Sequence, residues 1–317
     1  MYNRCRLYVW KLASGCSMQP FIGEGKMKTC RWLLLFPGFV LVFMMAATAA
    51  DAPTLTFKFT KYNVPGASAT GIGGINNSGV IVGEYEDTKS VQHCFMLSGG
   101  KVTTINYPKA ASDSCIHINS KGAIVGASKN TAGVTKGFVY QNGKFTDVPG
   151  PSGARSAVAY GINDSGVVVG TYTDAKDELH GFELKGKTYK ILDPPGSILT
   201  IATGINNAGN VVMFYGKSGA LESALYNGKT YKTINVPGAA NSFAFDINTA
   251  GDIVYETLNS SGTKAQAVLF QAGKFYTFGY PKSADSSATG INDKSEVVGY
   301  YQTKTISGPD QGFTATY

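Results

Sequence analysis

An isoleucine–asparagine pair recurs along most of the chain at a nearly constant spacing. Subtracting successive asparagine positions gives steps of 43, 44, 43, 42 and 44 residues. The pairs are Ile75-Asn76, Ile118-Asn119, Ile162-Asn163, Ile205-Asn206, Ile247-Asn248 and Ile291-Asn292. Self-similarity at a fixed period of this length is typical of repeat architectures, so this spacing constrains the fold more than any other feature.

Two further markers keep the same order and period. A proline closes an apolar run at Pro65, Pro108, Pro149, Pro195, Pro237 and Pro281. An apolar or aromatic residue recurs at Phe95, Phe138, Phe182, Leu225, Leu269 and Phe313. Three markers with six copies each indicate six structural units.

Each unit contains four short strand patterns. In the third unit they span residues 157–163, 167–172, 181–184 and 187–192, and β-branched and aromatic residues dominate them. After the first 50 residues, no stretch has a sustained period of 3.6. About forty residues in four strands is the blade of a β-propeller. The sequence therefore predicts an all-β fold, a six-bladed β-propeller of four-stranded antiparallel blades.

The two ends of the chain are predicted to close the ring together. The sixth unit stops at Tyr317 without a fourth strand, and residues 54–64 match the missing piece. An N-terminal strand that completes the last blade removes an open sheet edge. The apolar side chains expected between successive blades are Val80, Val82, Val167, Val169, Val211, Ile253 and Val297.

The first 50 residues do not belong to this repeat. Residues 27–31 are basic, residues 32–47 are hydrophobic, and residues 47–50 are small, which is the pattern of a secretory signal peptide. Pro37-Gly38 interrupts the apolar run, which is short for a membrane span, although a retained N-terminal anchor is the alternative. We therefore expect residues 1–26 to lie upstream of the true start at Met27, residues 27–50 to be cleaved, and residues 51–317 to form one domain that is secreted or held in the cell envelope.

Removal of this leader changes the charge balance. The first 50 residues hold 6 of the 28 basic and 1 of the 21 acidic residues, which leaves 22 against 20, a net charge of +2. Nucleic-acid binding requires clustered Lys and Arg, and no such cluster remains. We expect no nucleic-acid partner, no membrane span after cleavage, and a monomer.

Cys94 and Cys115 are the two cysteines that follow the leader. A bridge between them would join neighbouring blades, and an oxidising compartment favours it. Two buried thiols are the other interpretation. A metal site built from these cysteines with His93 and His117 matches no known ligand spacing.

The connections between strands differ in length, and this difference orients the molecule. The turns after the first and third strands of each unit are tight and lie on one face. The connections at residues 86–92, 173–180 and 301–311 are longer, as are the segments after each proline. They gather on the opposite face around the mouth of the central channel, which is the expected functional surface because loops on a rigid fold often carry binding residues.

Three residues are candidates for a ligand-binding site. Two positions before the marker asparagine, four units carry glycine, whereas His117 and Asp246 stand in units two and five, which are opposite in a six-membered ring. We expect them to face each other across the channel, too far apart for direct contact, either as a polar pair that grips a small ligand or as solvated lining. Arg155, the single arginine after the leader, suits an anionic ligand or is simply an exposed loop residue.

Motifs for catalysis are absent. The chain has three histidines and contains no Gly-x-Ser-x-Gly or His-Glu-x-x-His motif. No catalytic residue, metal ligand or cofactor is assigned. The acidic loops 84–87 and 174–178 could take Ca²⁺, but they lack the alternating spacing of a dedicated calcium loop.

The residues also carry a family resemblance. Gly161-Ile162-Asn163 with its following turn and Val168-Val169-Gly170, then His180-Gly181-Phe182, resemble the HAF-type extracellular repeats of bacteria over residues 54–317. The chain departs from the name-giving His-Ala-Phe, since it has Gly or Cys before the aromatic residues and Ala before the aliphatic Leu225. The resemblance implies an exported repeat protein without an established activity.

Two classes of function fit these observations. The first is an exported binding module for a cell-wall, polysaccharide or protein ligand. The second is a hydrolase or lyase that acts on carbohydrates or lactones at the channel mouth, and a purely structural surface protein is a third possibility. Acids with His117 at the mouth would favour the enzyme, and an aromatic or neutral polar mouth would favour binding.

Overall fold

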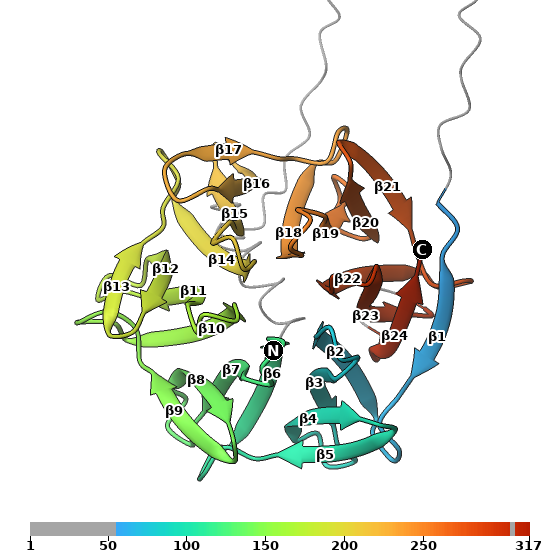
Figure 1. Ribbon diagram of the computed structural model, residues 1–317, viewed down its shortest axis with the longest axis horizontal. Coiled ribbons are helices and arrows are strands. Elements are labelled where there is room, and N and C mark those ends of the chain that lie inside the picture. Colours follow the sequence, from blue (N-terminus) through green and yellow to red (C-terminus); the bar gives the residue numbers. More distant parts are fainter. Residues whose placement is uncertain (1–54, 305–307) are drawn as a thin grey trace, which may run out of the picture.

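The computed structural model describes residues 55–304 and 308–317, so the expected leader lies outside the described residues. Strands β1 to β24 form six four-stranded antiparallel sheets. The sheets stand as blades around a central axis (Figure 1). The predicted six-bladed propeller is confirmed. Within the described ranges, no helix has the length and apolar character that a membrane crossing requires.

In blades 1 to 5 the strands run outward from the axis in chain order, and in blade 6 the outermost strand is β1. Blade 1 consists of β2 (Ala69–Ile75), β3 (Ile81–Glu86), β4 (Gln92–Ser98) and β5 (Lys101–Ile105). Blade 2 consists of β6 (Ser112–Ile118), β7 (Ile124–Lys129), β8 (Thr135–Gln141) and β9 (Lys144–Val148). Blade 3 consists of β10 (Ser156–Ile162), β11 (Val168–Thr173), β12 (Leu179–Lys185) and β13 (Thr188–Ile191).

The second half of the ring repeats this order. Blade 4 consists of β14 (Leu199–Ile205), β15 (Val211–Lys217), β16 (Ala220–Tyr226) and β17 (Tyr231–Thr233). Blade 5 consists of β18 (Asn241–Ile247), β19 (Ile253–Leu258), β20 (Ala265–Gln271) and β21 (Lys274–Phe278). Blade 6 consists of β22 (Asp285–Ile291), β23 (Glu296–Gln302), β24 (Gln311–Thr316) and β1 (Lys58–Tyr62).

The N-terminal strand closes the ring as predicted. β1 pairs with β24 in antiparallel register, from Lys58 opposite Thr316 to Tyr62 opposite Gly312. The two ends of the described chain therefore lie side by side at the rim of one blade (Figure 1). Phe57 stacks on Phe278 of blade 5 at a centroid distance of 4.2 Å, so this segment also packs against the neighbouring blade.

The apolar core lies between and within the blades. Of the side chains expected there, Val82, Val169, Val211, Ile253 and Val297 are buried. Val80 and Val167 are only partly buried, because each precedes its strand at the end of a tight turn.

Each blade fits one large side chain at the same central position. In four blades a second-strand glycine pairs with a buried phenylalanine of the third strand, as Gly170 does with Phe182. In blades 4 and 5 the large residue moves to the second strand, where Met213 pairs with Ala224 and Tyr255 with Val268. The residues in register with Phe182 are therefore Ala224 and Val268, one position before the markers expected at Leu225 and Leu269.

Candidate functional site

The two ends of the channel differ in size and chemistry. The end formed by the tight turns holds a small pit of about 50 Å³, lined by the six isoleucine–asparagine pairs and His117. The end formed by the long connections holds a pocket of about 570 Å³ between blades 1, 2 and 6. The large pocket lies on the face that the loop lengths predict.

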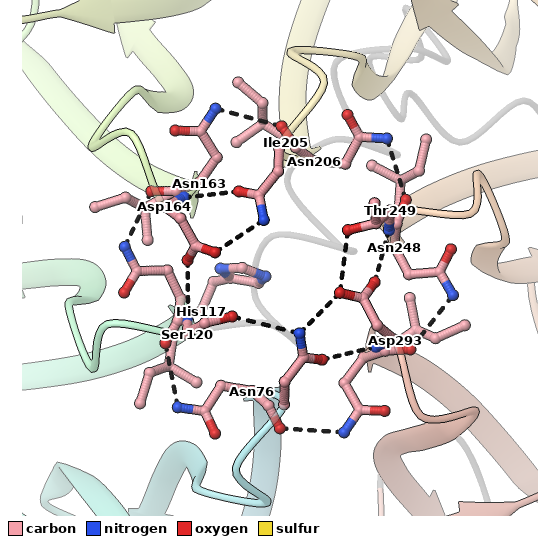
Figure 2. A pocket seen from close by; sticks show the side chains of 18 of the residues that line it. Asn76, His117, Ser120, Asn163, Asp164, Ile205, Asn206, Asn248, Thr249 and Asp293 are labelled. Atoms are coloured by element: carbon pink, nitrogen blue, oxygen red, sulfur yellow. Dashed lines mark hydrogen bonds between the residues drawn. The ribbon is translucent and has the colours of Figure 1, made fainter.

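The repeated asparagines form a closed ring of hydrogen bonds at the turn end (Figure 2). The side-chain oxygen of Asn163 accepts hydrogen bonds from the backbone N–H groups of Ser165 and Val167, which shapes its own turn. Its Nδ2 donates to the backbone oxygen of Asn206 in the next blade at 3.3 Å. The same link joins every blade to the next, the last one running from Asn292 to Asn76 at 3.1 Å. The marker asparagine therefore both makes the turn and ties the blades together.

A second set of contacts is made by the residues that follow the asparagines. The Asp293 carboxylate accepts hydrogen bonds from the Thr249 backbone N–H at 2.8 Å and from the Asn77 side-chain amide at 2.7 Å. Burial raises the pKa of Asp293, but these hydrogen bonds and one from the Thr249 hydroxyl outweigh it and hold the pKa below its ordinary value. Asp164 has the matching place in blade 3 and accepts from the Ser120 N–H at 2.9 Å.

The structure corrects the expected placement of His117 and Asp246. They are in contact, with Nε2 of His117 3.4 Å from Oδ1 of Asp246, and they lie at the turn end of the channel, away from the long connections. The channel is narrow here because glycine lets the innermost strands approach closely. A Cβ added to Gly204 would lie 2.8 Å from the Cα of Asp246, and one added to Gly74 would lie 3.0 Å from the Cα of His117.

The Asp246 carboxylate is buried and is held in place by backbone hydrogen bonds. Its side chain is 2 % exposed, and its two oxygens accept hydrogen bonds from the backbone N–H groups of Ile247 at 2.8 Å and Ile291 at 3.0 Å. Nδ1 of His117 is buried and has no hydrogen-bond partner among the described residues. Figure 2 places the His117 ring inside the asparagine ring.

Arg155 lies apart from this pair, on the long-connection face of blade 3. Its Nη1 is 2.6 Å from Oδ1 of Asp177, and the two side chains are 58 % and 71 % exposed. The three predicted site residues therefore do not converge on one site.

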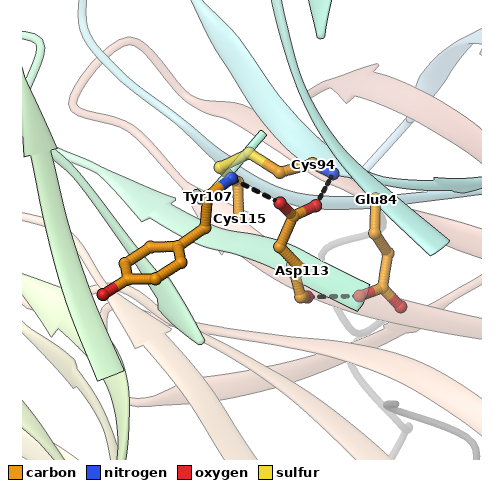
Figure 3. The surroundings of a disulfide bond; sticks show 6 residues. Glu84, Cys94, Tyr107, Asp113 and Cys115 are labelled. Atoms are coloured by element: carbon orange, nitrogen blue, oxygen red, sulfur yellow. Dashed lines mark hydrogen bonds between the residues drawn. A yellow bond between two sulfur atoms is a disulfide. The ribbon is translucent and has the colours of Figure 1, made fainter. Parts of the chain in front are cut away.

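A disulfide joins Cys94 of β4 to Cys115 of β6, with 5.0 Å between the two Cα atoms, and so connects blades 1 and 2 (Figure 3). Asp113 lies beside it and accepts hydrogen bonds from the backbone N–H groups of Cys94 at 2.8 Å and Tyr107 at 2.7 Å. Burial raises the pKa of Asp113 despite these bonds and the nearby His93. The neighbouring residue Ser114 donates its hydroxyl hydrogen bond to Glu84 of blade 1.

The large pocket is strongly polar. Three carboxylates line it, those of Glu84, Glu86 and Asp310. Further lining groups are the Gln92 amide, the Tyr85 ring, the Lys129 ammonium and the hydroxyls of Ser68, Ser90 and Ser112. None of these lining residues is predicted as a site residue from the sequence. The acidic loop 84–87 and the long connection 301–311, which both contribute to the pocket, are noted there as candidates.

Two of the pocket's acids also line a smaller adjoining cavity, which forms the neck of the pocket. This smaller cavity shares Gly71, Glu84 and Asp310 with the pocket and continues to Thr289 and Tyr300. Asp310 is held there because its Oδ1 accepts a hydrogen bond from Nε2 of Gln302 at 2.6 Å and its backbone oxygen accepts one from the Thr70 N–H at 2.9 Å. Residues more than two hundred positions apart thus form one wall.

Comparison with known proteins supports the fold alone. No protein-family model matches the sequence, and no curated protein is detectably similar. AofleA from Arthrobotrys oligospora superimposes with a TM-score of 0.52 at 12 % identity, covering 82 % of this chain and 93 % of that one. A virginiamycin B lyase from Staphylococcus aureus gives 0.49 at 11 % identity, covering 83 % and 100 %. A lectin from Aleuria aurantia in complex with a fucose–GlcNAc disaccharide gives 0.43 at 13 % identity, covering 70 % and 78 %. At 12 % identity the likeness to AofleA shows the β-propeller fold and no more.

Proposed function

We propose that this protein is an exported binding module whose ligand is a saccharide or a similar polyhydroxylated molecule, held in the pocket between blades 1, 2 and 6. Export rests on the signal-peptide pattern of residues 27–50 and on the resemblance to HAF-type extracellular repeats. The observation that carries the proposal is the pocket of about 570 Å³, which is in the range of small-molecule sites.

The chemistry of the lining supports this ligand class. Carboxylates accept hydrogen bonds from hydroxyl groups, and the Gln92 side chain both donates and accepts. Tyr85 adds an aromatic side chain to the same polar wall, with its ring stacked on His93 and its hydroxyl 3.1 Å from Oγ1 of Thr104. A wall that combines fixed hydrogen-bonding groups with one aromatic side chain fits a molecule that carries both hydroxyl groups and C–H surfaces.

The test is binding of a glycan panel to the chain from residue 51, measured by calorimetry or by the shift in melting temperature. We expect at least one glycan to raise the melting temperature, and we expect Glu86→Gln and Gln92→Ala to weaken its binding. Glu183→Gln is the matched control, because Glu183 is a carboxylate of β12 and does not line the pocket. A panel without binders, or binding that Glu183→Gln weakens as much as Glu86→Gln does, would reject the proposal.

The enzyme alternative rests on Glu84 and Asp310. Both acids line the neck of the pocket, and glycoside hydrolysis uses a pair of carboxylates. An enzyme site at this mouth is expected to include His117, but His117 lies at the opposite end of the channel, among the tight turns. Incubation of a bound glycan with the protein distinguishes a binding module from an enzyme. If the unaltered chain forms a product and the Glu84→Gln and Asp310→Asn variants do not, the protein is a hydrolase or lyase.

A further inference from the structure

A group of metal-ligating side chains lies on the long-connection face of blade 3, away from the pocket described above. Asp174, Glu178 and His180 each direct one ligand atom into a common space, and these atoms lie within 4.8 Å of one another. Nε2 of His180 is 3.8 Å from Oδ2 of Asp174 and 4.0 Å from Oε2 of Glu178. These separations are too long for hydrogen bonds, so the three groups face one another without touching.

A fourth residue fixes the orientation of the histidine. Nδ1 of His180 lies 2.7 Å from Oδ2 of Asp193, which follows β13, and the other oxygen of Asp193 accepts a hydrogen bond from the Gly181 N–H at 3.1 Å. A carboxylate acceptor at Nδ1 places the ring proton there and leaves the lone pair of Nε2 directed at the two other carboxylates. A lone pair that faces two anions calls for a cation between them, and a carboxylate behind a histidine is the usual second shell of a metal ligand.

Blade 1 contains an equivalent aspartate–histidine pair with which the group in blade 3 can be compared. Asp87 and His93 have the places of Asp174 and His180, on the same kind of turn and with the same stacking of the histidine on a tyrosine. Glu178 is replaced there by Val91 and Asp193 by Asn106. In blade 1, Nε2 of His93 lies directly on Oδ2 of Asp87 at 3.2 Å. The histidine and the aspartate are therefore farther apart in blade 3, where Glu178 and Asp193 are also present.

We propose that Asp174, Glu178 and His180 bind a divalent transition-metal ion of the Zn²⁺ class, with Asp193 as the positioning residue. An imidazole nitrogen with carboxylate oxygens suits zinc, whereas calcium takes six to eight oxygen ligands. Zinc bonds of about 2.0–2.2 Å require the ligand atoms to draw closer together. Glu178 is 59 % exposed and free to turn inward for this.

The charges around the group agree with a cation. The backbone N–H groups of Lys176 and Glu178 both donate hydrogen bonds to Oδ1 of Asp174, which holds this carboxylate in place while its Oδ2 faces His180. The only arginine of the described chain, Arg155, is paired with Asp177 on the same loop rather than with the three ligand groups.

The experiment is titration of the metal-free chain from residue 51 with Zn²⁺ against a chromophoric chelator. We expect one Zn²⁺ per chain, its loss in His180→Ala and Glu178→Gln, and an affinity lower by about 10- to 100-fold in Asp193→Asn. His93→Ala is the matched control and should bind as the unaltered chain does. Melting curves in EDTA show whether each variant is folded.

Two further measurements sharpen the test. Co²⁺ should give visible absorption bands that disappear with His180→Ala, and Ca²⁺ at the concentration of Zn²⁺ should not displace it. The double change Val91→Glu with Asn106→Asp should create a second Zn²⁺ equivalent in blade 1. No binding of Zn²⁺, binding that persists in His180→Ala, or equal loss in His93→Ala would overturn the site, and displacement by equimolar Ca²⁺ would overturn the assignment of the metal class.

Discussion

Single polar side chains hold the turn end of this propeller together. Each marker asparagine satisfies backbone N–H groups of its own turn and a backbone oxygen of the next blade. The residues that follow add further contacts between blades, and Asp293 has three hydrogen-bond donors from two other blades. Ionised oxygens accept stronger hydrogen bonds than neutral ones, so part of this network depends on the charge of Asp293.

The stability of the protein should therefore depend on Asp293 in a pH-dependent way. Because the folded-state pKa lies below the unfolded one, the contribution is present above the unfolded pKa of about 4 and is lost as the pH falls through the folded value. Asp293→Asn should lower the unfolding free energy at neutral pH by about 1 kcal/mol or less, since the group is partly exposed. Urea unfolding of both chains from pH 7 to pH 3 measures this. A difference that persists unchanged to pH 3 would contradict the role of the charge.

At the scale of the element, each blade places one large side chain in a fixed volume. In blade 3 a Cβ on Gly170 would lie 2.0 Å from the backbone oxygen of Val158 and 2.8 Å from the Phe182 ring. Met213 has the same place in blade 4, where its cross-strand partner is Ala224. The large residue can thus come from either strand, but not from both.

Exchange of the two arrangements tests this packing rule. Phe182→Ala should destabilise by about 3–5 kcal/mol, the usual cost of removing a buried phenylalanine ring. Gly170→Met should destabilise strongly, because the new side chain meets both the Val158 backbone and the Phe182 ring. The double variant carries the blade 4 pair and should melt at a higher temperature than Gly170→Met alone. An equal or lower melting temperature would show that the Phe182 ring is not the obstacle.

At the scale of the whole molecule, the ring is closed by contacts between segments far apart in the chain. β1 completes blade 6, the asparagine ring runs from blade 6 back to blade 1, and the Cys94–Cys115 disulfide joins blades 1 and 2. The disulfide lies beside the wall that carries Glu84 and Ser114, so it supports the large pocket as well as the ring.

Loss of the disulfide should weaken the fold without abolishing it. The cysteines are 21 residues apart, and closing a loop of this size stabilises by about 3 kcal/mol in the chain-entropy model. Reduction of the chain from residue 51 should lower its unfolding free energy by about this amount, and Cys94→Ala with Cys115→Ala should lower it similarly. The double variant is the control for the reductant, to which it should not respond. Equal stability with and without reductant in the unaltered chain would contradict this prediction.

The repeat, the blade and the closure of the ring follow from the sequence alone, because strand and turn preferences act over a few residues and the asparagine–turn unit recurs six times. Loop lengths likewise predicted the face with the large pocket. The contact of His117 with Asp246 was decided by the tertiary structure, since it depends on how closely glycine lets the inner strands approach. The same is true of Asp193 behind His180 and of Asp310 beside Glu84. Each pair lies on different strands or connections, and only the twist and spacing of the folded blades bring their side chains together.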